Sequence, residues 1–202
     1  MNRERLIGTA KKLDKLLKIV QIVNCAAVIF LLCGFLLLNI AYWVNPENVN
    51  RAGLIKVAMG EFALEMTYEA GIGLDLAYGW ANCIFVVILL IILWIEFHYA
   101  RKIIVPMMAG NPFDHSVSDC FKKLSYISLV YGTFGNVGSM VMTFMKMKYY
   151  QLERIVDGKQ ILSVTPEYQL ELGFLVVFFV FLLASYIFHY GAELQQLSDE
   201  TL

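Results

Sequence analysis

The sequence predicts an all-α integral membrane protein: a four-helix bundle with an N-terminal interfacial helix and a small outer β-hairpin. Hydrophobic residues make up 59% of the 202 residues and charged residues 16%, whereas soluble domains contain about 45–50% and about 25%. The charges are also segregated, because four stretches contain no Asp, Glu, Lys or Arg: Ile19–Pro46, Leu76–Ile95, Leu124–Met145 and Leu172–Ala192. Each is long enough to cross the hydrocarbon core of a bilayer, which takes about 20 helical residues.

We therefore expect one membrane domain covering residues 1–202, with spans near residues 19–44, 76–97, 124–146 and 168–192. The sequence shows no internal repeat. Its first apolar run is longer than the 7–15 residues, roughly, of a signal-peptide core, so it is expected to remain as the first span. The predicted inner segments hold ten Lys and Arg residues and the outer segments six. This asymmetry predicts a multi-pass plasma-membrane protein with both termini in the cytoplasm.

The first 18 residues are predicted to form a basic amphipathic helix. An apolar stripe recurs at helical spacing and consists of Leu6, Ala10, Leu13, Leu17 and Val20. Four lysines of this segment lie off the stripe. Such a helix lies in the membrane interface, with its lysines on anionic headgroups. It serves either as an orientation signal with a surface helix or as a docking surface for a cytoplasmic partner.

Two outer loops are predicted to carry structure. In residues 47–75 an apolar helical face from Ile55 to Met66 is accompanied by an acidic stripe, Glu61, Glu65 and Glu69. This stripe is either solvated or faces a cation, a metal or a basic peptide. In the third loop an Asp-Gly pair between two β-branched runs predicts a hairpin over residues 153–164.

The inner segment Gly110-Asn111-Pro112-Phe113 reads as a helix start. Asn111 is a preferred capping residue, Pro112 suits the first helical position, and Asp114 would then lie at the third. The third span that follows is the least apolar, and small or amide residues recur along it. We expect these residues to pack helices, within the chain or in a homo-oligomer: Ser128, Gly132, Gly135, Asn136 and Ser139.

No motif points to catalysis, so we expect a protein that is not an enzyme and binds no cofactor. His98, His115 and His189 lie near acidic residues, but no metal-ligand spacing supports a metal site. The net charge of −1 gives no polybasic footprint for direct nucleic-acid binding. The charge-free stretches lack the intramembrane ionisable group that ion-coupled carriers usually need. The four cysteines read as small apolar packing residues.

The C-terminal run Tyr190–Leu202, together with Gly110-Asn111-Pro112-Phe113, resembles a bacterial family of four-span membrane proteins typified by YoaS, a family of unknown function. The resemblance covers the whole chain in layout, and the Gly-Ala-Glu-Leu-Gln…Asp-Glu-Thr tail is its specific part. A common form of that tail has Glu where His189 stands here, which argues against a role for this histidine. Members are often paired with a small helix-turn-helix repressor-like protein. The resemblance thus implies a Gram-positive-type plasma-membrane regulator of transcription and supplies no catalytic residues.

The tail also makes physical sense as a binding element, because acidic residues at a helix C-terminus oppose the helix dipole. It should fray unless something basic engages it, either the N-terminal helix of this chain or a DNA-binding protein. The main expectation is a non-enzymatic membrane regulator or sensor with a cytoplasmic partner of helix-turn-helix type. The candidate partner-binding residues are Glu193, Leu194, Leu197, Asp199, Glu200, Asn111, Pro112, Phe113, Glu61, Glu65 and Glu69. The alternatives are an immunity protein against cationic antimicrobial peptides and an oligomeric permease for small solutes.

Overall fold

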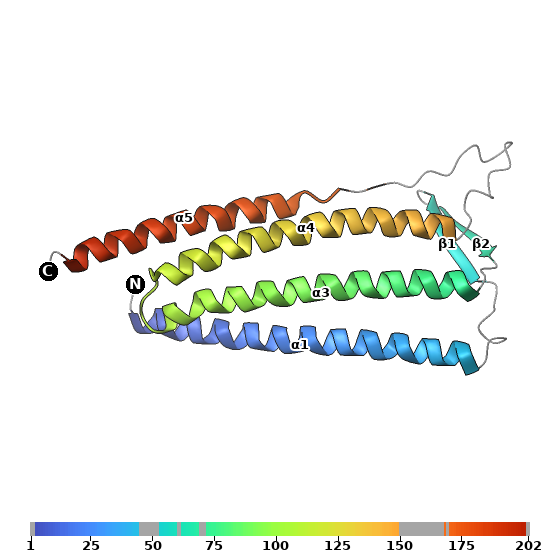
Figure 1. Ribbon diagram of the computed structural model, residues 1–202, viewed down its shortest axis with the longest axis horizontal. Helices are drawn as coiled ribbons and strands as arrows, with labels where there is room; N and C mark the ends of the chain where they lie inside the picture. The colour runs from blue at the N-terminus through green and yellow to red at the C-terminus, as the bar shows by residue number, and fades with distance from the viewer. Residues whose placement is uncertain are drawn as a thin grey trace. The chain divides into compact units, whose positions relative to one another are not determined.

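The computed structural model describes residues 3–44, 53–59, 62–68, 72–149, 168 and 170–200. Within these residues the chain forms four long helices and one pair of strands (Figure 1). In chain order the elements are α1 (Arg3–Val44), β1 (Gly53–Met59), β2 (Phe62–Tyr68), α3 (Ile72–Met108), α4 (His115–Tyr149) and α5 (Gly173–Glu200).

Three helices in the described part of the chain are long and apolar enough to cross a membrane. They contain the segments Ile7–Ala41, Ala77–Met108 and Gly173–Ser198, and only 11%, 6% and 6% of their most apolar windows are buried inside the molecule. Apolar helices that the protein itself leaves uncovered are the mark of a membrane protein, because water would not tolerate so large an apolar surface. Helix α4 falls outside this set, so the prediction of spans is supported for three of the four.

The predicted separate interfacial helix at the N-terminus is not supported, because α1 runs unbroken from Arg3 to Val44. No Gly or Pro lies between Thr9 and Cys33 to interrupt it. Ala10 is buried, but Leu13 on the same predicted stripe is exposed.

Residues 55–69 were predicted as a helix, and this prediction is wrong: β1 and β2 pair as antiparallel strands. The register runs from Gly53 opposite Tyr68 to Met59 opposite Phe62. Only Gly60 and Glu61 separate the strands in sequence, and a Gly-X pair favours such two-residue connections. The register also sets Lys56 opposite Glu65. The hairpin predicted over residues 153–164 lies outside the described residues.

The turn after α3 differs from its prediction, since α4 begins at His115 and not at Asn111. Gly110, with a φ of 84°, donates its amide to Met107 O, and Asn111 donates its own to Pro106 O. These two bonds close the end of α3 as a Schellman motif. Asn111 therefore takes part in the C-terminal end of α3 and is not the N-cap of α4.

The chain divides into two compact units. The terminal unit contains Met1–Val28, Val87–Asn136 and Leu170–Leu202, and the hairpin unit contains Ile29–Val86 and Val137–Gln169. Each is described by itself. In the terminal unit, segments of α1, α3, α4 and α5 lie alongside one another, and the N-terminal end of α1 and the C-terminal end of α5 lie at the same end of that unit (Figure 1).

The terminal unit buries polar groups in its interior and exposes apolar ones. Its fully enclosed side chains are Val117 and Ser125. Five further polar residues on α1 and α4 are at least nine-tenths buried, while Ile22 and Val23 on α1 are well over half exposed. The buried five are Asp14, Gln21, Asn24, Ser118 and Ser128. This arrangement reverses that of a soluble protein and suits an exterior of lipid.

Candidate functional site

Helices α4 and α5 are joined by a reciprocal pair of buried hydrogen bonds. Ser118 Oγ donates to Ser185 O at 2.9 Å, and Ser185 Oγ donates to Ser118 O at 3.0 Å. Above and below this pair, Phe121 stacks on Phe188 with ring centroids 5.1 Å apart, and Tyr126 lies against Phe178. These contacts fix the alignment of the two helices, and hence of the residues that follow on α5.

The turn between α3 and α4 docks onto α5 through an aromatic ring over a glycine. A Cβ added at Gly191 would lie 2.5 Å from Phe113 Cδ1, so only glycine leaves room for this ring. The Phe113 ring also lies 5.8 Å from the Phe188 ring, centroid to centroid. The turn predicted from Gly110–Phe113 and the predicted tail are therefore brought together.

Asp114 holds the turn in place as the N-cap of α4. Its Oδ1 accepts the amide of Ser116 at 2.8 Å, and its carbonyl accepts the amide of Val117 at 2.9 Å. Hydrogen bonding from Ser116 lowers the pKa of the Asp114 carboxyl below its usual value, because such bonds favour the ionised form. Asp114 therefore carries a negative charge at the edge of the docked turn.

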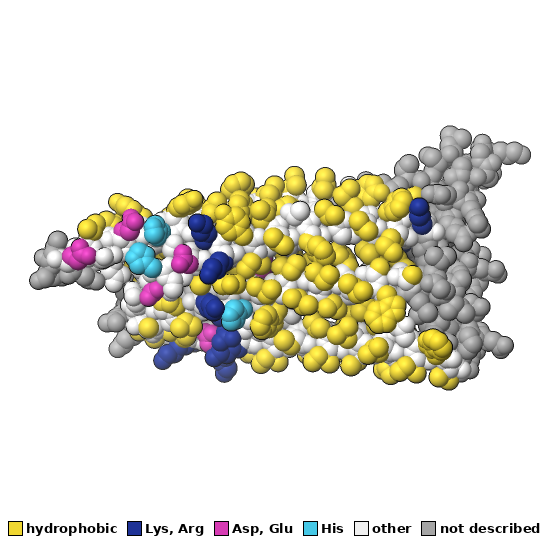
Figure 2. Space-filling model, in the orientation of Figure 1, with side chains coloured by type: hydrophobic (Ala, Val, Ile, Leu, Met, Phe, Trp, Pro, Cys, Tyr) yellow, Lys and Arg dark blue, Asp and Glu magenta, His cyan; other side chains and the backbone are white. Residues whose placement is uncertain are grey.

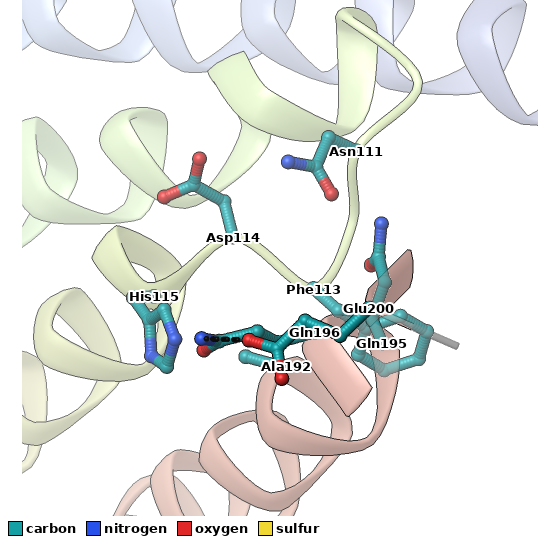
Figure 3. A pocket seen from close by; sticks show the side chains of 8 residues that line it. All are labelled: Asn111, Phe113, Asp114, His115, Ala192, Gln195, Gln196 and Glu200. Atoms are coloured by element: carbon teal, nitrogen blue, oxygen red, sulfur yellow. Dashed lines mark hydrogen bonds between the residues drawn. The ribbon is translucent and has the colours of Figure 1, made fainter. Parts of the chain in front are cut away.

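An open hollow of about 390 Å³ lies between this turn and the end of α5 (Figure 3). One wall comes from the turn and the start of α4, and the other from the last turns of α5. Along the α5 wall, Gln196 Nε2 donates to Glu200 Oε1 at 3.0 Å. Within the described chain no Lys or Arg lines the hollow; its lining is Asn111, Phe113, Asp114, His115, Ala192, Gln195, Gln196 and Glu200.

Two histidines meet beside the hollow. The rings of His115 and His189 lie edge to face, 5.8 Å apart, and His189 Nε2 is 3.4 Å from Glu193 Oε1. In the residues that the structure describes, no three His, Cys, Asp or Glu side chains are grouped so that they could hold a metal ion. The chemistry on offer is therefore hydrogen bonding and negative charge, which suit a basic or amide-bearing group.

A band of basic residues crosses the terminal unit between its apolar surface and this acidic end. Figure 2 shows a group of Lys and Arg side chains between most of the hydrophobic side chains and most of the acidic and histidine ones. Lys18 and Arg101 share Asp14, and Lys102 and Lys123 share the Tyr99 ring. Lys122 is next to Lys123 on α4, between Tyr126, which packs on Phe178, and Ser118, which bonds to Ser185. These Lys and Arg residues are the basic band.

A polar seam lies beneath the basic band, between α1 and α3. Arg101 Nε donates to Asp14 Oδ1 at 2.9 Å, and Arg101 Nη1 donates to Gln21 Oε1 at 2.9 Å. Asp14 also pairs with Lys18 at 2.9 Å. Farther along α3, Glu96 Oε1 accepts a hydrogen bond from Ser128 at 2.9 Å. Glu96 falls inside the apolar segment Ala77–Met108. The lack of charge in the spans, which the sequence predicts, therefore counts less against an ion-coupled carrier.

The predicted partner-binding residues are only partly brought together. Asn111, Phe113 and Glu200 line the hollow, and Pro112 lies in the same turn. Glu193, Leu194 and Leu197 are exposed on α5. The backbone of Asp199 is part of α5, and its side chain lies outside the description. Glu65 lies in β2 and not in a helix, while Glu61 and Glu69 lie outside the described residues.

The predicted packing residues also have different fates. Gly132 is buried against the Phe174 ring, and Asn136 bonds to Gly132 O and to the backbone of Glu171. Gly135, in contrast, has nothing within 4 Å of an added Cβ, and Ser139 is exposed.

Sequence reasoning missed His115, Ala192, Gln195 and Gln196 as parts of the hollow, because only the packing of α4 on α5 brings them together. It also missed Gly191 as the position on which Phe113 packs. It also missed the polar seam. A signal for the seam was present, since Ala10, Asp14, Leu17, Gln21 and Asn24 alternate in steps of four and three residues, the spacing of a helix seam. A search for a buried helix face among apolar residues alone overlooks this pattern, because three of its five residues are polar.

The chain matches no protein-family model, and no curated protein or solved structure shows significant similarity to it. The resemblance to the YoaS-type family stays a prediction.

Proposed function

We propose that the chain is a four-span plasma-membrane protein that acts as a regulator without enzymatic activity. The charged end of its terminal unit faces the cytoplasm and binds a basic partner protein. The observation that supports this most is the hollow, where the acids Asp114 and Glu200 meet amide side chains and the described lining holds no Lys or Arg. Such a surface attracts a basic segment and guides its approach.

The orientation follows from where the basic residues lie. Ten of the described Lys and Arg residues belong to the terminal unit, in Arg3–Lys18 and in Arg101–Lys123, and positive charge stays on the cytoplasmic side. Helix α4 is proposed as the fourth span. It has 35 residues, its stretch Leu124–Met145 carries no charge, and Ser125, Ser128 and Asn136 in that stretch bond within the terminal unit.

The end of α5 adds an apolar face beside the acidic one. Beyond the basic band, α5 continues from Tyr186 to Glu200, roughly 22 Å at the rise of an α-helix. Tyr186, Tyr190 and Leu194 share one side of the helix by their spacing and are exposed. A partner helix with an apolar stripe and basic flanks would match this surface, in the way helices dock on grooves. A DNA-binding regulator, as the YoaS-type resemblance implies, carries the basic surface required.

The test is site-specific photocrosslinking in cells from Gln195, at the wall of the hollow. We expect a soluble protein to be captured through a basic segment, and capture to fall when both Asp114→Asn and Glu200→Gln are present. Asn caps a helix about as well as Asp, so this variant removes charge and keeps the turn. The matched control is Glu171→Gln, an exposed acid whose backbone, not its side chain, makes the bonds to Asn136.

Capture that is indifferent to the double variant, or lost equally in the control, would overturn the proposal. So would capture of only a second copy of this chain, since the hollow would then be an oligomer contact. A basic segment crosslinked in the wild type and in Glu171→Gln, but not in the double variant, supports it.

A further inference from the structure

Two lysines from different helices converge on one tyrosine ring in the terminal unit. Lys102 Nζ lies 5.3 Å from the centroid of the Tyr99 ring, and Lys123 Nζ of α4 lies 5.8 Å from the same centroid. Tyr99 and Lys102 are one turn apart on α3, whereas Lys123 reaches the ring from the neighbouring helix. Each ammonium group gains from the negative face of the ring, but the two positive charges repel each other.

The charge of this lysine pair is not neutralised within the described chain. Arg101, next to Lys102, is paired with Asp14, yet no ion pair in the described residues joins either Lys102 or Lys123 to a carboxylate. Asp119 lies one turn before Lys123 on α4 without reaching it. Both lysines are exposed, so an anion can approach them from outside.

Both lysines act electrostatically on the buried thiol of Cys120. Burial raises the pKa of Cys120, while the positive charges of Lys102 and Lys123 act to lower it and Asp119 adds to the rise. The lysines thus act on one point between α3 and α4, and their effect on the pKa of Cys120 is smaller than that of burial.

The pair lies in the basic band, where the apolar surface of the terminal unit gives way to its charged end (Figure 2). In a membrane protein this border is where lipid headgroups lie. The position therefore selects an anion that is carried on a lipid over one that is free in solution.

We propose that Tyr99, Lys102 and Lys123 form a binding site for the phosphate of an anionic phospholipid headgroup. Basic clefts between membrane helices on the cytoplasmic side are suited to such headgroups. The two ammonium groups donate hydrogen bonds to phosphate oxygens, and the phosphate relieves the repulsion between them. Cation–π attraction to the Tyr99 ring favours conformations in which the two ammonium groups lie near one another.

The site is tested with the full-length protein by native mass spectrometry after release from nanodiscs of equimolar phosphatidylglycerol and phosphatidylcholine. We expect the wild type to retain phosphatidylglycerol selectively. Lys102→Gln and Lys123→Gln should each reduce its retention about fivefold, and the double variant by more than either. The matched control is Lys148→Gln, because Lys148 Nζ also lies over an aromatic ring, that of Phe144, at 4.8 Å.

Two further arms keep the outcome decisive. The variant Lys102→Arg with Lys123→Arg keeps both charges and should retain the lipid, which separates loss of charge from loss of folding. Excess inorganic phosphate should leave the bound phosphatidylglycerol in place. Unchanged retention in the double Gln variant, an equal loss in Lys148→Gln, or displacement by inorganic phosphate would overturn the proposal.

Discussion

Replacing Gly191 by alanine separates the stability of α5 from the docking of the turn that forms the hollow. Gly191 lies inside a helix, where alanine is better than glycine by about 1 kcal/mol. The new Cβ, however, would lie 2.5 Å from Cδ1 and 2.7 Å from Cε1 of Phe113. Phe113 is 42% exposed and lies on a turn, so its ring can move outward and α5 need not distort.

The movement costs the contact between Phe113 and Phe188, worth about 0.5–1.5 kcal/mol for an aromatic pair. The helix gain and the contact loss nearly cancel, so the free energy of unfolding should change by less than about 1 kcal/mol. The turn itself should loosen, with faster hydrogen exchange at the amides of Phe113 and Val117 and weaker crosslinking from the hollow.

The measurement combines thermal unfolding in detergent with hydrogen exchange resolved to the turn. The control is Gly8→Ala in α1, where nothing lies within 4 Å of an added Cβ; it should stabilise the helix without changing exchange in the turn. If Gly191→Ala raised stability like the control and left the exchange of Phe113 unchanged, the close packing of this ring on α5 would be refuted.

Three other substitutions or reactions probe the terminal unit. Arg101→Gln should lower the free energy of unfolding by about 1.5–3 kcal/mol, the worth of hydrogen bonds to a charged group, and a thermal midpoint equal to that of the wild type would contradict it. Ser118→Ala and Ser185→Ala each remove one of two separate hydroxyl-to-carbonyl bonds and should each cost roughly 1 kcal/mol; the double variant should cost about their sum, apart from coupling through the two hydroxyls, which lie 3.4 Å apart, and an unchanged thermal midpoint in either single variant would contradict the pair. Cys120 should react slowly with iodoacetamide at neutral pH and faster as the pH rises, since burial raises the pKa of its thiol; a rate like that of a free thiol would contradict its burial.

The membrane class could be predicted from the sequence because segregation of charge is a property of composition along the chain. Length and hydropathy sufficed for α1, α3 and α5. They did not reveal how far each helix continues, since α3 runs to Met108 although its charge-free stretch ends at Ile95. Helical hydrogen bonding does not stop where charges begin, and Glu96 and Arg101 find partners inside the unit.

The site was harder to predict than the fold. The turn at Gly110 and the tail could each be identified from local sequence. They meet because α4 packs on α5, which places Phe113 of the turn against Gly191 of α5. The error over residues 55–69 has another cause. Apolar residues there fit a helical face as well as alternate strand positions, and a short segment does not decide between the two periods; the pairing of β1 with β2 does.

The basic band is proposed to mark the membrane border, so that the end of α5 lies in water. Spin labels at exposed positions along α5, in a variant without native cysteines, would measure depth by power saturation with oxygen and a nickel chelate. We expect a label at Val176 to be accessible to oxygen and one at Leu194 to nickel, with the crossover between Leu183 and Tyr190. A label at Leu194 that is accessible to oxygen and shielded from nickel would place the end of α5 in the membrane and refute this border.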